Sequence, residues 1–200
     1  MNKDKKQNLM TAIVNSRNVI FKLHKLEPIV NKAVSVISGK LANNGKIFLC
    51  GNGGSHSDAE HICSELLIRL RPHFNRDPIP AMLLGQNMST LTACSNDYDF
   101  KYIFSKSLKA FSTGNRKDML IVYSTSGNSL NVIEVLKLAK KMNVFSICLL
   151  GKNGGKAAKL SNLNLIIPSN NTARIQEAHI FLSHYIFEEV EKNIFKKKQI

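Results

Sequence analysis

Hydrophobic residues recur at helical spacing through the first fifth of the chain. From about Asn8 to Leu41, apolar side chains such as Ile13, Val19 and Val34 return every three or four positions. Pro28 interrupts this pattern, and proline is tolerated at the first turn of a helix but not in its interior. The region therefore predicts two helices ahead of the first strand.

Five short apolar segments follow, at residues 46–50, 79–84, 119–123, 144–150 and 163–167. Helical stretches alternate with them. The first follows residue 55 and runs to about residue 69, the second lies near residue 89, and the others lie at 128–142, 154–160 and 172–194. Parallel strands need helical crossovers, so this alternation predicts a parallel sheet covered on both faces. We expect an α/β fold, a three-layer α/β/α sandwich with a five-stranded parallel sheet. We expect one domain over residues 1–200, with N-terminal helices at about 8–41, an α/β core at about 46–167 and a C-terminal helix at about 172–194.

The formal net charge of +14 raises the question of an anionic partner. The densest lysine clusters lie at the two ends, at residues 3–6 and 196–198, and no aromatic residues are interleaved with them. A solvated surface explains such terminal clusters. We expect no nucleic-acid partner and no membrane partner.

Four cysteines, Cys50, Cys63, Cys94 and Cys148, lie in or beside apolar stretches and form no CxxC pair. Buried free thiols in a reducing compartment account for them. No secretory signal and no run long enough to span a bilayer is recognisable. These features predict a cytoplasmic protein.

The first strand ends in a glycine-rich segment, Gly51-Asn52-Gly53-Gly54-Ser55. It matches neither the dinucleotide nor the Walker fingerprint, and a structural turn alone would also need glycines. On the helix that follows, His61 and Glu65 lie one turn apart on one face, with Arg69 a turn further on. This pair could bind a divalent metal or share a proton transfer, although surface pairs with this spacing are also common. Asp58 and Glu60 fit ordinary acids of a first helical turn.

A hydroxyl-rich segment, Ser124-Thr125-Ser126-Gly127-Asn128-Ser129, follows the third strand and precedes an apolar helix. Free N–H groups and hydroxyls at a helix N-terminus bind phosphate well, whereas one helix cap needs fewer hydroxyls. The segment therefore predicts a phosphate-binding loop.

The last helix carries Gln176 and His184, eight residues apart and able to face one side. Taken alone, a histidine on such an apolar helix is more often a core or surface residue than a ligand. We assign that ordinary role to the other histidines, His24, His56, His73 and His179.

Together, residues 50–55 with His61 and Glu65, the segment 124–129 and the segment Ala173-Arg174-Ile175-Gln176-Glu177-Ala178-His179 resemble the sugar isomerase (SIS) domain family. Within it they are similar to the phosphoheptose isomerases, which convert D-sedoheptulose 7-phosphate to D-glycero-D-manno-heptose 7-phosphate for lipopolysaccharide or capsule precursors. The resemblance runs from about residue 8 to 194. It implies a flavodoxin-like sheet, a homotetramer with active sites shared between subunits, and a zinc ion.

The resemblance also implies roles for individual residues. Glu65 and His184 match the catalytic acid/base positions. The implied metal ligands are His61, Glu65, Gln176 and His184. The implied contacts to the phosphorylated heptose are Asn52, Gly53, Gly54, Ser55, Glu65, Arg69, Asn96, Asp97, Ser124, Thr125, Ser126, Ser129 and Gln176.

Three alternatives stay open at this point. A non-catalytic binding protein of the same fold, similar to replication-initiator-associating proteins, would lack the counterparts of Glu65 and His184. A sugar-phosphate-sensing regulator would be expected to carry a helix-turn-helix domain, for which this sequence has no segment. Another aldose–ketose isomerase acting on a pentose or hexose phosphate is excluded less firmly.

Overall fold

The five strands form one parallel sheet in the order β2-β1-β3-β4-β5, as shown by a computed structural model that describes residues 8–114 and 116–195. The strands are β1 (Ile47–Gly51), β2 (Ala81–Leu83), β3 (Met119–Ser124), β4 (Phe145–Leu150) and β5 (Leu163–Ile166). This is the flavodoxin-like order, in which ligands bind at the carboxyl ends of strands near the β1/β3 switch point. The expected sheet is confirmed.

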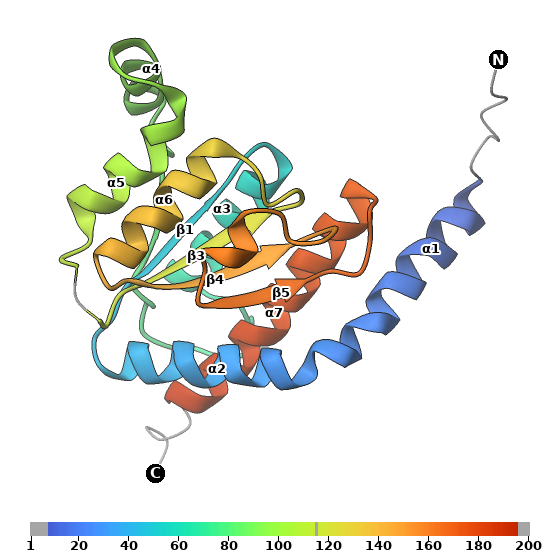
Figure 1. Ribbon diagram of the computed structural model, residues 1–200. Coiled ribbons are helices and arrows are strands. Elements are labelled where there is room, and N and C mark those ends of the chain that lie inside the picture. Colours follow the sequence, from blue (N-terminus) through green and yellow to red (C-terminus); the bar gives the residue numbers. More distant parts are fainter. Residues whose placement is uncertain (1–7, 115, 196–200) are drawn as a thin grey trace, which may run out of the picture.

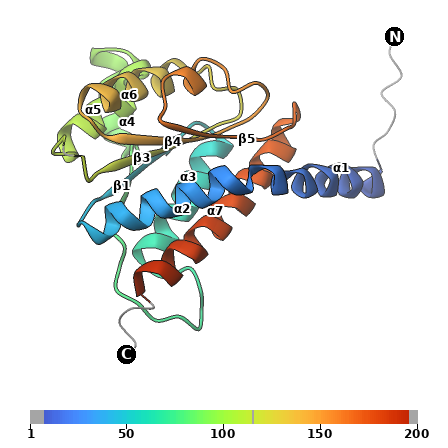
Figure 2. The ribbon, with the colours of Figure 1, turned by 60° about the horizontal axis from the view of Figure 1, so that its bottom comes forward.

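Helices cover both faces of the sheet (Figures 1 and 2). Along β3, Met119, Ile121 and Tyr123 join one hydrophobic core, and Leu120 and Val122 join the other, because successive side chains of a strand point to opposite faces. The first core is completed by α1 (Leu9–Lys22), α2 (Glu27–Ala42), α3 (Gly54–Leu67) and α7 (Thr172–Phe195). The second is completed by α4 (Met88–Asp97), α5 (Ile103–Phe111) and α6 (Leu130–Lys141). The three-layer arrangement is therefore confirmed.

Helix α1 projects beyond the body of the molecule in both views (Figures 1 and 2). Its apolar side chains include Leu9, Ile13 and Phe21, which are 77%, 51% and 74% exposed. Isolated exposed apolar residues are common, but a row of them along one projecting helix is typical of an association surface.

Two helix predictions differ from the structure. The expected helix at residues 154–160 is reduced to a short 3₁₀ turn, Ala157–Lys159, because Gly154 and Gly155 both adopt positive φ angles of 82° and 56°. Helix α5 had no counterpart among the predicted elements. It buries Ile103, Phe104 and Leu108, and the polar segment Ser105-Lys106-Ser107 interrupts this apolar set in the sequence.

All four cysteines are buried and free, as expected. Among the described helices, none combines the length and apolar character needed to cross a bilayer. The terminal lysine clusters at residues 3–6 and 196–198 lie outside the described residues.

Candidate active site

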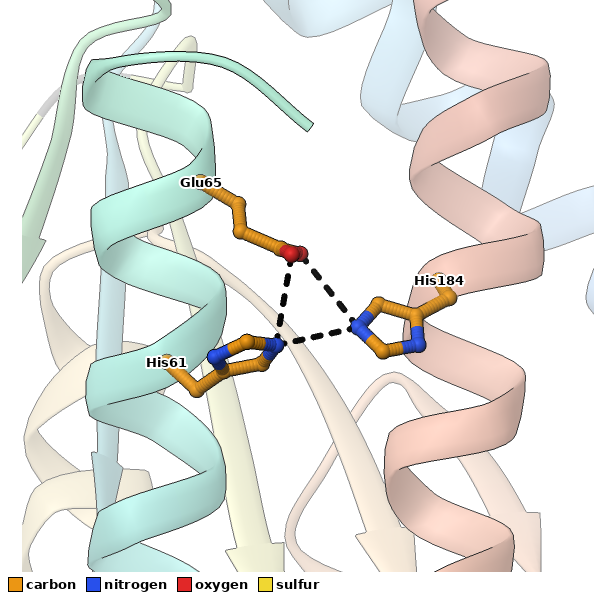
Figure 3. Close-up of side chains that lie close together, drawn as sticks. All are labelled: His61, Glu65 and His184. Atoms are coloured by element: carbon orange, nitrogen blue, oxygen red, sulfur yellow. Dashed lines mark hydrogen bonds and ion pairs between the residues drawn. The ribbon is translucent and has the colours of Figure 1, made fainter. Parts of the chain in front are cut away.

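Three side chains from two helices converge on one point (Figure 3). His61 and Glu65 lie one turn apart on α3, and His184 faces them from α7. The Nε2 atoms of the two histidines are 3.1 Å apart. Glu65 Oε1 lies 3.2 Å from His61 Nε2, and Glu65 Oε2 lies 3.4 Å from His184 Nε2. The fold thus brings together residues that are more than a hundred positions apart in the sequence.

Partial burial changes the chemistry of the Glu65 carboxylate. Loss of water around Glu65 raises its pKa, and the nearby negative charges of Glu191 and Glu188 act in the same direction. His61 and His184 oppose this change. A carboxylate with a raised pKa is a stronger base near neutral pH than an exposed one.

The donor set fits a divalent metal such as zinc. The two imidazole nitrogens and the carboxylate oxygen lie within 4.8 Å of one another. Tetrahedral zinc with bonds of about 2.0–2.1 Å places neighbouring ligand atoms roughly 3.3 Å apart, close to the three separations measured between His61, Glu65 and His184. Glu65 Oε2 is buried and, beside the 3.4 Å approach of His184 Nε2, has no hydrogen-bond partner, so a bound cation would satisfy it.

The glycine loop after β1 lies at the start of α3 and is held by close backbone contacts. A methyl group at Gly51 would lie 2.4 Å from the carbonyl oxygen of Ser55, so the sharp turn from strand to helix requires glycine there. Gly53 has a φ of 54°, which favours glycine. The Gln176 amide packs against Gly54, where a methyl group would lie 2.2 Å from Gln176 Nε2.

Gln176 therefore lies near the beginning of α3. His61 follows Gly54 by seven residues, or about 10 Å along a helix axis. The structure thus brings His61, Glu65 and His184 together and places the Gln176 amide nearer the glycine loop.

The hydroxyl-rich loop after β3 has a folded shape that its own side chains stabilise. Ser124 Oγ accepts a hydrogen bond from the Gly127 N–H at 3.0 Å, and Ser126 Oγ accepts one from the Asn128 N–H at 3.2 Å. Ser129 is the N-cap of α6, and its side chain makes no capping hydrogen bond. Part of the hydroxyl set thus shapes the loop, and the Ser129 hydroxyl is available to a ligand.

The sequence reasoning missed two features that position these loops. Asn131, at the second residue of α6, exchanges two side-chain hydrogen bonds with Asn52 of the glycine loop. The segment 151–155 after β4 packs backbone to backbone on the hydroxyl-rich loop, so that a methyl group at Gly155 would lie 2.5 Å from the Ser126 carbonyl oxygen. The signals available in the sequence were the asparagine two residues after Ser129 and the pair Gly154-Gly155.

An open pocket of about 300 Å³ lies where the two loops meet. Asn52, Ser129 and Asn131 line it together with residues 99–101. A larger pocket of about 430 Å³ between α1 and α7 is lined mainly by apolar side chains such as Phe21, Phe181 and Tyr185. The smaller pocket has the polar groups that orient a ligand.

Some predicted site residues lie at the surface. Arg69 is exposed just beyond the end of α3, and Asn96 and Asp97 are exposed at the end of α4, where the Asn96 amide donates to Asp97 Oδ1 at 2.8 Å. The interpretation of Asp58 as an ordinary first-turn acid is wrong. It lies in the second turn of α3, half-buried, with Oδ2 lacking a hydrogen-bond partner, and burial raises its pKa to about 6.

Comparison with known proteins identifies the family of this chain. The family model described as the SIS domain matches residues 14–151. A phosphoheptose isomerase of Leptospira biflexa is 42% identical over 173 residues, covering 86% of this chain and 88% of the relative.

Two solved structures agree with this match. A phosphoheptose isomerase from Francisella tularensis superposes with a TM-score of 0.85 at 31% identity, covering 92% of this chain and 96% of that one. The enzyme from Neisseria gonorrhoeae gives 0.84 at 36% identity, with 92% and 97% covered. The chain belongs to the SIS domain family and, within it, to the phosphoheptose isomerases.

Proposed function

We propose that this enzyme converts D-sedoheptulose 7-phosphate to D-glycero-D-manno-heptose 7-phosphate. The observation that carries the proposal is the convergence of His61, Glu65 and His184, because it supplies both proton-transfer groups that an aldose–ketose isomerisation needs. The names of the relatives support a heptose phosphate as the substrate.

The reaction moves a hydrogen from C1 to C2 through an enediol. In our proposal Glu65 removes a proton from C1, and an N–H of the His184 imidazole supplies the proton that C2 gains, while a hydroxyl proton passes from O1 to O2. The raised pKa of Glu65 suits the first step, because a base is most effective when its pKa approaches the working pH. The two groups could exchange these roles in the reverse direction.

We further propose that His61, Glu65 and His184 hold a zinc ion, with Gln176 as a fourth ligand. When bound, zinc would polarise the substrate carbonyl and stabilise negative charge on the enediolate. Gln176 lies against Gly54 in this structure, so its participation requires its side chain to turn toward the histidines.

The phosphate of the substrate would bind at the loop of residues 124–129, on the N-terminus of α6. Backbone N–H groups and the Ser129 hydroxyl are the donors that a phosphate accepts there. Asn52 to Ser55, Arg69, Asn96, Asp97 and Gln176 remain proposed contacts to the sugar.

A homotetramer with shared active sites is part of the proposal. The exposed apolar row of α1 supports self-association. We propose that the product feeds the synthesis of lipopolysaccharide or capsule precursors. A location in the cytoplasm agrees with the four buried free thiols, because such a compartment keeps thiols reduced.

Turnover of sedoheptulose 7-phosphate by the purified protein, followed by NMR with and without added zinc, tests the proposal. We expect the aldose product, formed faster when zinc is present. Tight binding of the sugar phosphate without turnover would instead favour a binding protein. Turnover of a pentose or hexose phosphate, but not of sedoheptulose 7-phosphate, would support the proposed isomerisation but contradict the proposed substrate.

A further inference from the structure

A buried cluster of charges joins the two helices that carry the candidate active site. Arg76, between α3 and β2, and Glu191, on α7, have side chains that are 0% exposed. Arg76 Nε donates to Glu191 Oε1 at 2.5 Å, and Arg71 Nε donates to Oε2 at 2.9 Å. Apolar residues of similar volume often stabilise a fold as well as a buried ion pair does. Stability alone therefore gives a weak reason for this arrangement.

Two further hydrogen bonds from Arg76 reach the backbone of α3. Arg76 Nη2 donates to the carbonyl oxygen of Glu65 at 2.8 Å, and Nη1 donates to that of Leu66 at 2.9 Å. Helix α3 ends at Leu67, so these carbonyls belong to the last turn, where helical partners run out. One guanidinium thus fixes the backbone of Glu65 itself.

On α7 the cluster shares a face with His184. Glu191 follows His184 by seven residues, which is two helical turns or about 10 Å. The last turn of α3 and the face of α7 are consequently joined twice, once through Glu65 and His184 and once through Arg76 and Glu191. Two contacts between rigid helices fix their rotation as well as their separation.

We propose that Arg76 and Glu191 are positioning residues that hold Glu65 opposite His184. Arg71 holds the Glu191 carboxylate from its other side. The proposal rests on the proposed function, in which Glu65 and His184 transfer protons and bind zinc. A purely structural role would lower the stability but leave the kcat of the folded enzyme unchanged, so the two roles are separable.

Arg76→Lys and Glu191→Gln are the test variants, and Glu189→Gln is the matched control. Glu189 lies on the same helix, where it pairs with Lys192, and is 32% exposed. The variants are assayed with sedoheptulose 7-phosphate at a temperature where circular dichroism shows each one folded. We expect the test variants to lose about 10- to 100-fold in kcat, with KM within about twofold, because displacement of a catalytic group acts on the reacting geometry. The control should match wild type.

Zinc affinity, measured by competition with a chromophoric chelator, gives a second readout that needs no turnover. Arg76→Lys and Glu191→Gln should bind zinc about tenfold more weakly, because groups that orient ligands influence the metal. Folded variants with wild-type kcat and wild-type zinc affinity would overturn the proposal.

Glu65→Gln, measured in parallel, separates this proposal from the proposed function. Wild-type turnover in Glu65→Gln would overturn the role of Glu65 as base, whereas the zinc readout would still test the positioning role of Arg76 and Glu191. If Arg76→Lys does not fold, Arg71→Lys replaces it, because the Arg71 side chain is 27% exposed. That variant should lose several-fold in kcat or zinc affinity, and no change in either would contradict the proposal.

Discussion

Asn52 and Asn131 form a reciprocal amide pair, with Asn52 Nδ2 donating to Asn131 Oδ1 at 2.9 Å and Asn131 Nδ2 donating to Asn52 Oδ1 at 2.8 Å. Asn52 belongs to the glycine loop after β1, and Asn131 to the first turn of α6. The pair therefore links the two loops proposed to bind the sugar and its phosphate. Asn131 is 2% exposed, so water cannot replace a lost partner easily.

Replacing Asn131 with alanine should weaken both the fold and substrate binding. The Asn52 amide would lose its partner, which costs about 1–3 kcal/mol of unfolding free energy. Loss of the link between the loops should also raise KM for the sugar phosphate several-fold. Urea unfolding and steady-state kinetics measure the two effects. Asn31→Ala, at an exposed position of α2, is the control, and equal behaviour of the two variants would refute the link.

Replacing Glu65 with glutamine should abolish turnover while sugar-phosphate binding persists. The amide is close to isosteric but cannot accept a proton, so we expect kcat to fall by at least about 100-fold. Kinetics and calorimetric titration of the sugar phosphate are the measurements. Glu60→Gln, exposed on the same helix, should remain active. Wild-type activity in Glu65→Gln would remove Glu65 from the mechanism.

Replacing Gly127 with alanine should disrupt the proposed phosphate loop. Gly127 has a φ of 63°, and an added methyl group would lie 2.0 Å from the Gly154 carbonyl oxygen. We expect a loss of more than about 2 kcal/mol in stability and weaker sugar-phosphate binding. Gly39→Ala is the control, because no atom lies within 4 Å of the added methyl group, and alanine is the better helix former. A Gly127→Ala protein as stable as wild type would contradict the structure.

The stability of the protein should carry a pH-dependent contribution from His179. The side chain is 0% exposed, and burial lowers its pKa from 6.5 to about 4. Between these pH values the unfolded chain binds a proton that the folded chain does not, so this contribution is present above pH 6.5 and is lost as the pH falls toward 4. Asp58 acts in the opposite direction, because burial raises its pKa from 3.8 to about 6.

A His179→Gln variant isolates the histidine from Asp58. Between pH 7 and pH 4, the difference in unfolding free energy between wild type and variant should move by roughly 3 kcal/mol in favour of the variant. Urea unfolding across this range measures it. His73→Gln, at an exposed position, should show no such change. A constant difference for His179→Gln would show that the buried ring does not titrate in this way.

The sequence by itself determined the class of fold and the local character of both loops. Short apolar strands alternating with helices leave few arrangements other than a parallel sheet with two helical layers. The glycines after β1 and the hydroxyls after β3 mark the proposed ligand loops because their chemistry is local. His61 and Glu65 were also recognisable as a pair, since helical periodicity places residues four apart on one face.

Only the tertiary structure decided which distant residues meet. His184 became part of a site because α7 packs beside α3, and nothing in the spacing of His61 and Glu65 identifies that partner. The pairing of Asn131 with Asn52 and that of Arg76 with Glu191 could not be predicted for the same reason. Helical and strand periodicity report which face a residue occupies, whereas the packing of one element on another depends on contacts between segments far apart in the chain.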